Sequence, residues 1–183
     1  MDFSLSKEHL ALQAKAKEFT EQVLFPHEME CEENDGISKE THAQITQQVL
    51  DWEFNAPNHS KEDGGQGFTI FEQTLLNEQL GAATGAIWDA LWYPSYPMRF
   101  ASQAQKEEYL IPTCQGKRRD AYAITEADAG SDPTQCVTRA DKVDGGWRIN
   151  GEKWFVTIGD IADYILVHAH VDGDVNKPTV FFV

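Results

Sequence analysis

The chain has 183 residues, which is long enough for one large domain or two small ones with a buried core. Apolar residues make up 41% of the sequence and charged residues 25%, a composition that excludes wholesale disorder. The formal net charge of -15 argues against nucleic acid or an anionic membrane surface as the main partner.

The location of the protein can be predicted from the same composition. No stretch approaches the roughly 18 apolar residues of a membrane span, and the first residues lack the layout of a signal peptide. The three cysteines, Cys31, Cys114 and Cys136, are widely spaced and form no zinc-type pair. We therefore expect a cytoplasmic protein in a reducing compartment.

The first helix is predicted over residues 5–24, where apolar side chains recur at the helical period, and Pro26 is expected to end it. The apolar positions are Leu5, Leu12, Ala16, Phe19 and Val23. An acidic run follows, made of Glu28, Glu30, Glu32, Glu33 and Asp35. We interpret this run as the solvated face of a loop rather than a metal site.

Two further helices have clear starting residues. Ser38 is suited to cap a helix whose buried face carries Ile45, Val49 and Trp52. After a loop at residues 55–67 that is rich in turn formers, Thr69 and Glu72 have the spacing of a capping box. The helix that they open is expected to face the core through Phe71, Leu75 and Leu80.

Two more helices complete the first half of the chain. One is predicted over residues 81–92, before Pro94 and Pro97. A short helix should begin at Ser102–Gln105 and reach Leu110, with Pro112 closing it.

The pattern changes from helical to strand-like after about residue 118. Strands are predicted at 121–125, 135–142, 147–150, 153–157, 164–170 and 179–183, and Asp144–Gly146 has the sequence of a hairpin turn. Consecutive antiparallel strands after a run of helices predict an α+β fold. The N-terminal all-α helical domain should span residues 1–117, followed at 118–183 by an incomplete antiparallel β-barrel or sheet domain. Because the sequence ends inside the apolar run Pro178–Val183, we expect a truncated or early-stopping chain.

Two polar segments in the second half carry the functional signal. The first is Tyr122–Asp132, and the second is Asn150–Thr157. Gly130 would let the main chain approach a ligand closely, since it has no Cβ. Thr125, Ser131 and Thr157 each offer a hydroxyl on a short stem. By themselves these features predict only a ligand-binding loop.

Four segments, in the same order, resemble the acyl-CoA dehydrogenase family. They are the glycine-rich loop Glu62–Gly67, the helix Ser102–Pro112, the segment Tyr122–Glu126 with Ala129–Asp132, and the segment Trp147–Lys153 with Phe155–Thr157. The family fold has an N-terminal helical domain, a middle β-domain and a C-terminal helical bundle. This chain resembles the first domain and part of the second, and nothing in it resembles the bundle.

The resemblance implies FAD as cofactor and assigns residues to it. Tyr122, Ile124 and Thr125 would meet the ring and its pyrimidine edge, Ser131 the pyrophosphate or nearby CoA groups, and Thr157 the N5 atom. Phe155 stands where the family often has a tryptophan packed on the ring, so stacking is kept while the indole N–H is lost.

The implied reaction is the α,β-dehydrogenation of an acyl-CoA thioester, with hydride transfer to flavin N5 and an electron-transfer flavoprotein or oxygen as acceptor. The family's glutamate base lies in the bundle, so no residue here is assigned as catalytic, Glu126 included. We expect the isolated chain to bind FAD weakly and to be inactive, and the full-length protein to be a homo-oligomer. The alternatives are a related flavoprotein, such as an acyl-CoA oxidase or flavin monooxygenase, and a non-catalytic remnant or subunit of a split enzyme.

Two other groups of residues allow more than one interpretation. His168 and His170 alternate along one predicted strand, where exposed positions are favoured over a metal site because no third ligand has suitable spacing. The aromatic residues Trp88, Trp92, Tyr93 and Tyr96 could line an acyl pocket, although core packing is favoured.

Overall fold

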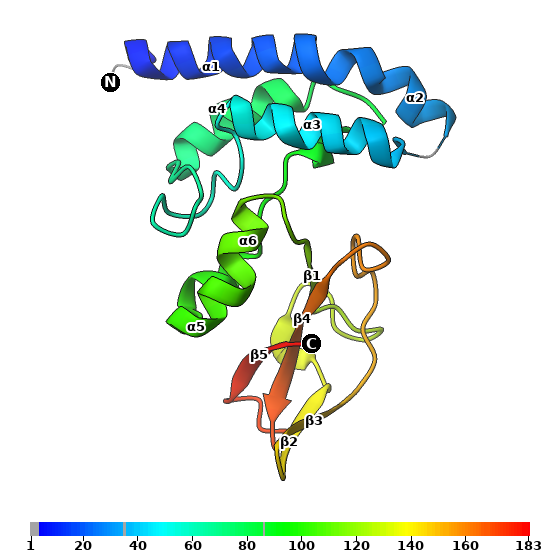
Figure 1. Ribbon diagram of the computed structural model, residues 1–183. Helices are drawn as coiled ribbons and strands as arrows, with labels where there is room; N and C mark the ends of the chain where they lie inside the picture. Colours follow the sequence, from blue (N-terminus) through cyan, green and yellow to red (C-terminus); the bar gives the residue numbers. More distant parts are fainter. Residues whose placement is uncertain (1–3, 35, 86) are drawn as a thin grey trace. The chain divides into compact units, whose positions relative to one another are not determined.

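The computed structural model describes residues 4–34, 36–85 and 87–183, apart from the side chains of residues 88 and 89. The chain forms two compact units, Met1–Lys117 and Arg118–Val183, the first helical and the second built on a sheet (Figure 1). The α+β prediction is confirmed.

The helical unit is built from three longer helices and several short turns. Its α-helices are α1 (Lys7–Phe19), α2 (Glu28–Glu33), α3 (Lys39–Asp51), α4 (Ile70–Leu80), α5 (Gln103–Gln105) and α6 (Ile111–Cys114). π-helical turns lie at Thr20–Leu24 and Lys106–Leu110, and 3-10 turns at Phe25–His27, Ile87–Ala90 and Tyr96–Phe100. Helix α1 packs along α4, and the core between the helices includes Phe19, Ile45, Phe54 and Leu76.

Helix starts agree with the sequence prediction because they depend on local caps. The Ser38 hydroxyl accepts a hydrogen bond from the Thr41 N–H, and Thr69 forms the expected capping box with Glu72. Ile45, Val49, Leu75 and Leu80 are buried as predicted. The inward position expected of Phe71 is wrong, because 49% of this residue is exposed, beside the ring of His9.

The helix ends predicted at Pro26 and Pro112 are wrong. Pro26 does not end the first helical segment, since the chain continues through α2 to Glu33, and the acidic run is therefore helical up to that residue. Asp35 lies outside the described residues. Pro112 likewise lies inside α6 and does not close the helix at Leu110.

A π-helical turn precedes each of these two prolines. Proline lacks an N–H and its ring collides with the carbonyl four residues earlier in a regular helix. The wider turns at Thr20–Leu24 and Lys106–Leu110 bond each N–H five residues back and thereby change this spacing.

The helix predicted over residues 81–92 is also wrong. Gly85 adopts a left-handed φ of +62°, which interrupts helical geometry, and among the described residues of this stretch the only helical element is the short 3-10 turn Ile87–Ala90.

The second unit is a five-stranded mixed sheet. Its strands are β1 (Asp120–Ala123), β2 (Arg139–Val143), β3 (Gly146–Asn150), β4 (Tyr164–Val171) and β5 (Pro178–Phe182). The central strand β4 pairs with β5 in antiparallel and with β1 and β2 in parallel orientation, while β2 and β3 form the predicted hairpin. The prediction of consecutive antiparallel strands is wrong for the two parallel pairs, because residues 151–163 carry the chain from β3 back to the start of β4.

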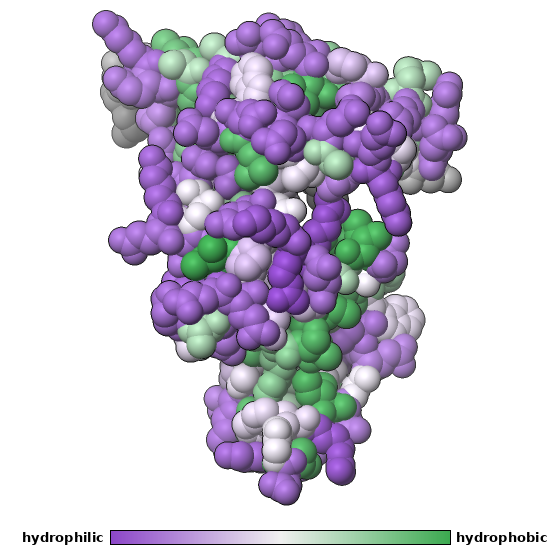
Figure 2. Space-filling model, viewed as in Figure 1, coloured by the Kyte–Doolittle hydropathy of each residue, from purple (hydrophilic) through white to green (hydrophobic). Residues whose placement is uncertain are grey.

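Two predicted strands also have different bounds. Residues 153–157 form no strand, and the one predicted from residue 135 begins at Arg139, after a 3-10 turn at Pro133–Gln135. The first of these changes gives irregular backbone to the polar segment Asn150–Thr157. Figure 2 shows mostly hydrophilic residues on the visible face of the helical unit and a gathering of apolar residues on that of the sheet unit.

Candidate functional site

The first polar segment leaves the sheet at the end of β1 and folds into a tight turn. The Glu126 N–H donates to the Ala129 carbonyl at 3.0 Å, and the Ala129 N–H donates back to the Glu126 carbonyl at 3.2 Å. Gly130 and Ser131 follow this turn and are exposed. The turn thus presents a small, polar stretch of backbone to solvent.

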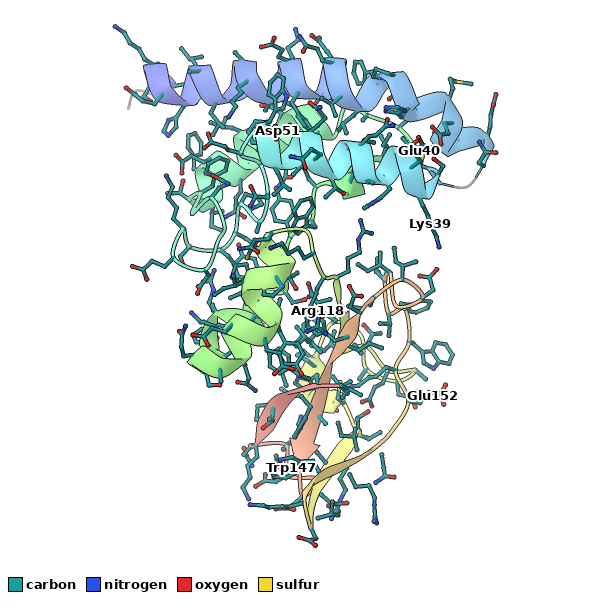
Figure 3. The ribbon with its side chains drawn as sticks, viewed as in Figure 1. Lys39, Glu40, Asp51, Arg118, Trp147 and Glu152 are labelled. Carbon is teal, nitrogen blue, oxygen red and sulfur yellow. The ribbon has the colours of Figure 1, made fainter. Side chains whose placement is uncertain are left out.

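The second polar segment follows β3 and is held in an unusual backbone conformation. Phe155 has a φ of +52° and Ile158 a φ of +56°, in the left-handed region that bulky and β-branched residues rarely adopt. The Phe155 side chain is 83% exposed, with its ring edge-on to Trp154 at 5.9 Å between centroids. The Trp154 indole N–H donates to Glu152, which Figure 3 labels on this stretch. Such strain is characteristic of functional sites.

Three hydrogen bonds join the two segments. The Trp154 N–H donates to the Thr125 carbonyl at 2.9 Å. The Lys153 ammonium donates to the Ile124 carbonyl at 2.9 Å and to the Glu126 carboxylate at 2.7 Å. The structure therefore brings together Tyr122–Glu126 and Lys153–Phe155, which the sequence separates by nearly thirty positions.

We call the contact between Tyr122–Glu126 and Lys153–Phe155 the junction, and Glu126 lies at its centre. Its carboxylate also accepts the N–H groups of Val137 at 2.6 Å and Thr138 at 3.0 Å, and its side chain is only 7% exposed. Burial by itself would raise the pKa of Glu126, but the bonds from Lys153 and the backbone N–H groups outweigh it and lower this pKa to about 2. Glu126 is thus a buried, permanently charged hydrogen-bond acceptor at neutral pH.

Neither Glu126 nor Lys153 was recognised as a structural centre from the sequence. Both lie inside the segments that resemble the family, but their burial and pairing are seen only in the structure. Cys136 adds a further contact, since its thiol donates to the same Ile124 carbonyl at 3.3 Å.

The residues predicted to bind a cofactor fall into two groups. Tyr122, Ile124 and Thr125 are half-buried at the end of β1, and burial raises the pKa of the Tyr122 hydroxyl. Gly130, Ser131, Phe155 and Thr157 are exposed. Within the described part of the chain, the hydroxyls of Thr125, Ser131 and Thr157 have no hydrogen-bond partner.

Gly130 lies in open surroundings. A Cβ placed there would have no protein atom within 4 Å, so packing within the chain does not require a glycine at this position.

The two histidines of β4 are buried, so the exposed positions predicted for them are wrong. His168 is 8% and His170 2% exposed, with ring centroids 5.4 Å apart, because this strand is central and covered. Burial lowers the pKa of His168. Among the described residues, no three His, Cys, Asp or Glu side chains are grouped as a metal site would require.

The four aromatic residues considered for an acyl pocket belong to the helical unit. Trp92 and Tyr93 pack partly against the helical core, which favours the core interpretation for them, whereas Tyr96 is 42% exposed. The Trp88 side chain lies outside the described residues. A cleft of about 380 Å³ lies beside Tyr93, lined also by Asn77, Leu80, Gly81 and Ala83. Burial raises the pKa of Tyr93 to about 12.

In the part of the chain that the structure describes, no helix combines the length and the apolar character needed to cross a membrane.

Comparison with known proteins accounts for both units. The model of the acyl-CoA dehydrogenase N-terminal domain matches residues 6–117, and that of the acyl-CoA dehydrogenase middle domain matches residues 121–183. The short-chain specific acyl-CoA dehydrogenase of Clostridium acetobutylicum is 30% identical over 177 residues, which cover 94% of this chain and 46% of that protein. The (R)-benzylsuccinyl-CoA dehydrogenase of Thauera aromatica is 31% identical over 173 residues, covering 86% and 43%.

Solved structures give the same result. An acyl-CoA dehydrogenase complexed with FAD from Bacillus anthracis matches with a TM-score of 0.80 and 25% identity, over 98% of this chain and 31% of that one. The FAD complex of PigA matches with a TM-score of 0.86 and 28% identity, over 100% and 49%. The chain spans less than half the length of these relatives. On these matches, which run through both units in the family's order, the chain belongs to the acyl-CoA dehydrogenase family.

Proposed function

We propose that the two joined segments form one wall of an FAD site in an oxidoreductase that dehydrogenates an acyl-CoA thioester between its α and β carbons. The observation that carries this proposal is the junction itself. Hydrogen bonds from Lys153 and Trp154 hold the second segment against Ile124 and Thr125. The junction lies within the region that matches the family's middle domain.

The residues present fit a flavin in chemical character. An exposed aromatic ring at Phe155 offers an apolar surface for stacking. Nearby hydroxyls at Thr125 and Thr157 have no partner among the described residues and could bond to the polar edge of a ring. When bound, FAD would supply the N5 atom that accepts hydride.

Each residue has a proposed role toward FAD. Thr157 would donate a hydrogen bond toward N5, and Ser131 would bind the pyrophosphate or neighbouring CoA groups. Tyr122, Ile124 and Thr125 would contact the ring and its pyrimidine edge. Gly130 would leave room for close approach of the ligand, in keeping with the open space around it.

The proposal assigns no catalytic base to this chain. A general base works best when its pKa lies near the operating pH, and the pKa of Glu126 is about 2. Its carboxylate is also already occupied by Lys153 and two backbone N–H groups. These contacts suit a structural role and argue against proton abstraction.

A titration of the purified chain with FAD tests the proposal through Thr157→Ala. We expect weaker binding or a changed flavin absorption spectrum with unchanged folding, because the residue is exposed and only the proposed N5 contact is lost. Thr157→Ser keeps the hydroxyl and should behave as the unaltered chain. An identical affinity and spectrum for the alanine variant would count against the N5 assignment.

The reaction needs a separate experiment. Incubation with FAD and a panel of acyl-CoAs should give no flavin bleaching at enzymatic rates, because the chain supplies no base. Bleaching would show that a base is present after all.

If the flavin is bleached, its reoxidation by an electron-transfer flavoprotein or by oxygen would distinguish a dehydrogenase from an oxidase. Size-exclusion chromatography would test the proposed homo-oligomer.

A further inference from the structure

The Glu126–Lys153 ion pair is buried, and both side chains also form hydrogen bonds to the backbone. The Lys153 and Glu126 side chains are 9% and 7% exposed, and Lys153 divides its bonds between the Glu126 carboxylate and the Ile124 carbonyl. Glu126 in turn receives the Val137 and Thr138 N–H groups. Three irregular stretches, at residues 124–126, 136–138 and 151–154, are thus attached to one ion pair.

This pair also fixes the orientation of one peptide group. In a trans peptide the C=O and the following N–H point in opposite directions, and the described residues contain no cis peptide bond. Lys153 and Cys136 hold the Ile124 carbonyl toward the interior of the junction. The Thr125 N–H must therefore point away from the junction, and among the described residues it has no hydrogen-bond partner.

The next peptide group is fixed in a similar way. The Thr125 carbonyl accepts the Trp154 N–H, so it too is turned toward the second segment. The Ile124 and Thr125 carbonyls therefore both point away from the side that a ligand would approach. What remains on the outer side is the donor N–H of Thr125, which suits a ligand edge rich in acceptor atoms.

We propose that Glu126 and Lys153 are positioning residues that set the Thr125 N–H as an outward-facing hydrogen-bond donor for a ligand with acceptor atoms. That this ligand is the flavin ring edge rests on the proposed function. Neither side chain contacts the ligand. Their effect passes through the Ile124–Thr125 peptide group and the backbone of residues 151–154.

The test compares three forms of the full chain. Removing one member of the pair would leave a buried charge and could unfold the unit, so the main variant is the double substitution Glu126→Gln with Lys153→Met, which removes both charges together. The matched control is Asp174→Asn with Lys177→Met, an ion pair in the same unit whose side chains are 38% and 57% exposed. FAD affinity and amide hydrogen exchange are measured for each form.

We expect the main variant to bind FAD roughly 10- to 100-fold more weakly, the scale on which the loss of an orienting partner acts at metal sites. Exchange of the Trp154 N–H should accelerate, whereas the Ile165 N–H, bonded to the Val183 carbonyl between β4 and β5, should keep its protection. The control should match the unaltered chain in both measurements.

Other outcomes overturn the proposal. FAD affinity within twofold of the unaltered chain would show that the pair does not position a binding group. Equal acceleration of exchange at Trp154 and Ile165 would show that the pair stabilises the whole unit and nothing more local. If the unaltered chain binds no FAD, the proposed function fails, and the exchange pattern alone decides the positioning role.

Discussion

The helical unit and the sheet unit use polar side chains over different distances along the chain. In the helical unit, Ser38, Thr69 and Ser102 each cap a helix by bonding to a residue three positions later. In the sheet unit, Glu126 and Lys153 are 27 positions apart and hold three irregular stretches together. A local bond defines where an element begins, whereas the distant pair defines a surface. The proposed site lies where regular structure is absent and long-range polar bonds replace it.

The largest effect should come from breaking the distant pair on one side only. Lys153→Met leaves the Glu126 carboxylate buried without its partner, which should cost about 3–5 kcal/mol of the unfolding free energy of the sheet unit. Lys106→Met breaks the matching pair of the helical unit, where Lys106 and Asp63 are 20% and 14% exposed, and should cost about 1–2 kcal/mol. Denaturant titration followed by hydrogen exchange in each unit measures both values. Equal losses of unfolding free energy in the two variants would contradict the expected difference between the two ion pairs.

The next largest effect should come from acid, which we expect to lower the unfolding free energy of the sheet unit through Glu126. Because the pKa of Glu126 in the folded chain is lowered to about 2 from its usual 4.5, the stabilisation it gives is complete above pH 4.5 and is lost as the pH falls toward 2. This loss amounts to about 3 kcal/mol in the sheet unit. Urea unfolding at several pH values should show it, and the double variant Glu126→Gln with Lys153→Met should lack it. An unchanged acid slope in that variant would assign the effect to other groups.

A smaller effect is expected where two irregular stretches touch. A Cβ at Gly151 would lie 2.8 Å from the Thr138 Cα and closer still to the Thr138 side chain. Gly151→Ala should therefore destabilise the sheet unit by about 1–3 kcal/mol. Gly130→Ala, in open space, should stay within about 0.5 kcal/mol. Thermal unfolding of the two variants provides the measurement, and similar melting temperatures would contradict the close contact.

The smallest effect should come from a local cap. Thr69→Ala removes the hydroxyl that accepts the Glu72 N–H and should cost about 1 kcal/mol, confined to the helical unit. Thr69→Ser keeps the hydroxyl and should be nearly neutral. Hydrogen exchange along α4 (Ile70–Leu80) would locate the loss, and a loss extending into the sheet unit would contradict the local nature of the cap.

The same difference in distance explains what the sequence could predict. Helix starts at Ser38 and Thr69 were predicted because the capping residues and their partners lie within one turn. The parallel pairing of β1 with β4 was not, since it depends on the path of residues 151–163. The strand predicted at residues 153–157 does not form, because the Lys153 and Trp154 bonds hold the backbone beside Phe155 outside the strand conformation.

For the candidate site, the sequence could predict the two segments but not the contacts that join them. The two segments could be named from their residues and their resemblance to a family, and the residues assigned to FAD remain a proposal. The contacts that join the segments could not be predicted, because a glutamate and a lysine in polar loops are usually exposed. Their burial becomes evident only when residues 136–138 are folded against them.

The two π-helical turns have a consequence for the direction in which side chains face. Each residue of an α-helix turns the chain by about 100°, and a π turn accommodates one residue more than a regular turn. Residues after Lys106–Leu110 are therefore rotated by about that angle from the faces that a continuous helix would give them, whereas Thr20–Leu24 is followed at once by the tighter 3-10 turn Phe25–His27. Cys114 is buried on the rotated face. A π turn thus accommodates one extra residue, so deleting a single residue there would let a regular α-helical turn replace it while the later side chains of that helical segment keep their faces.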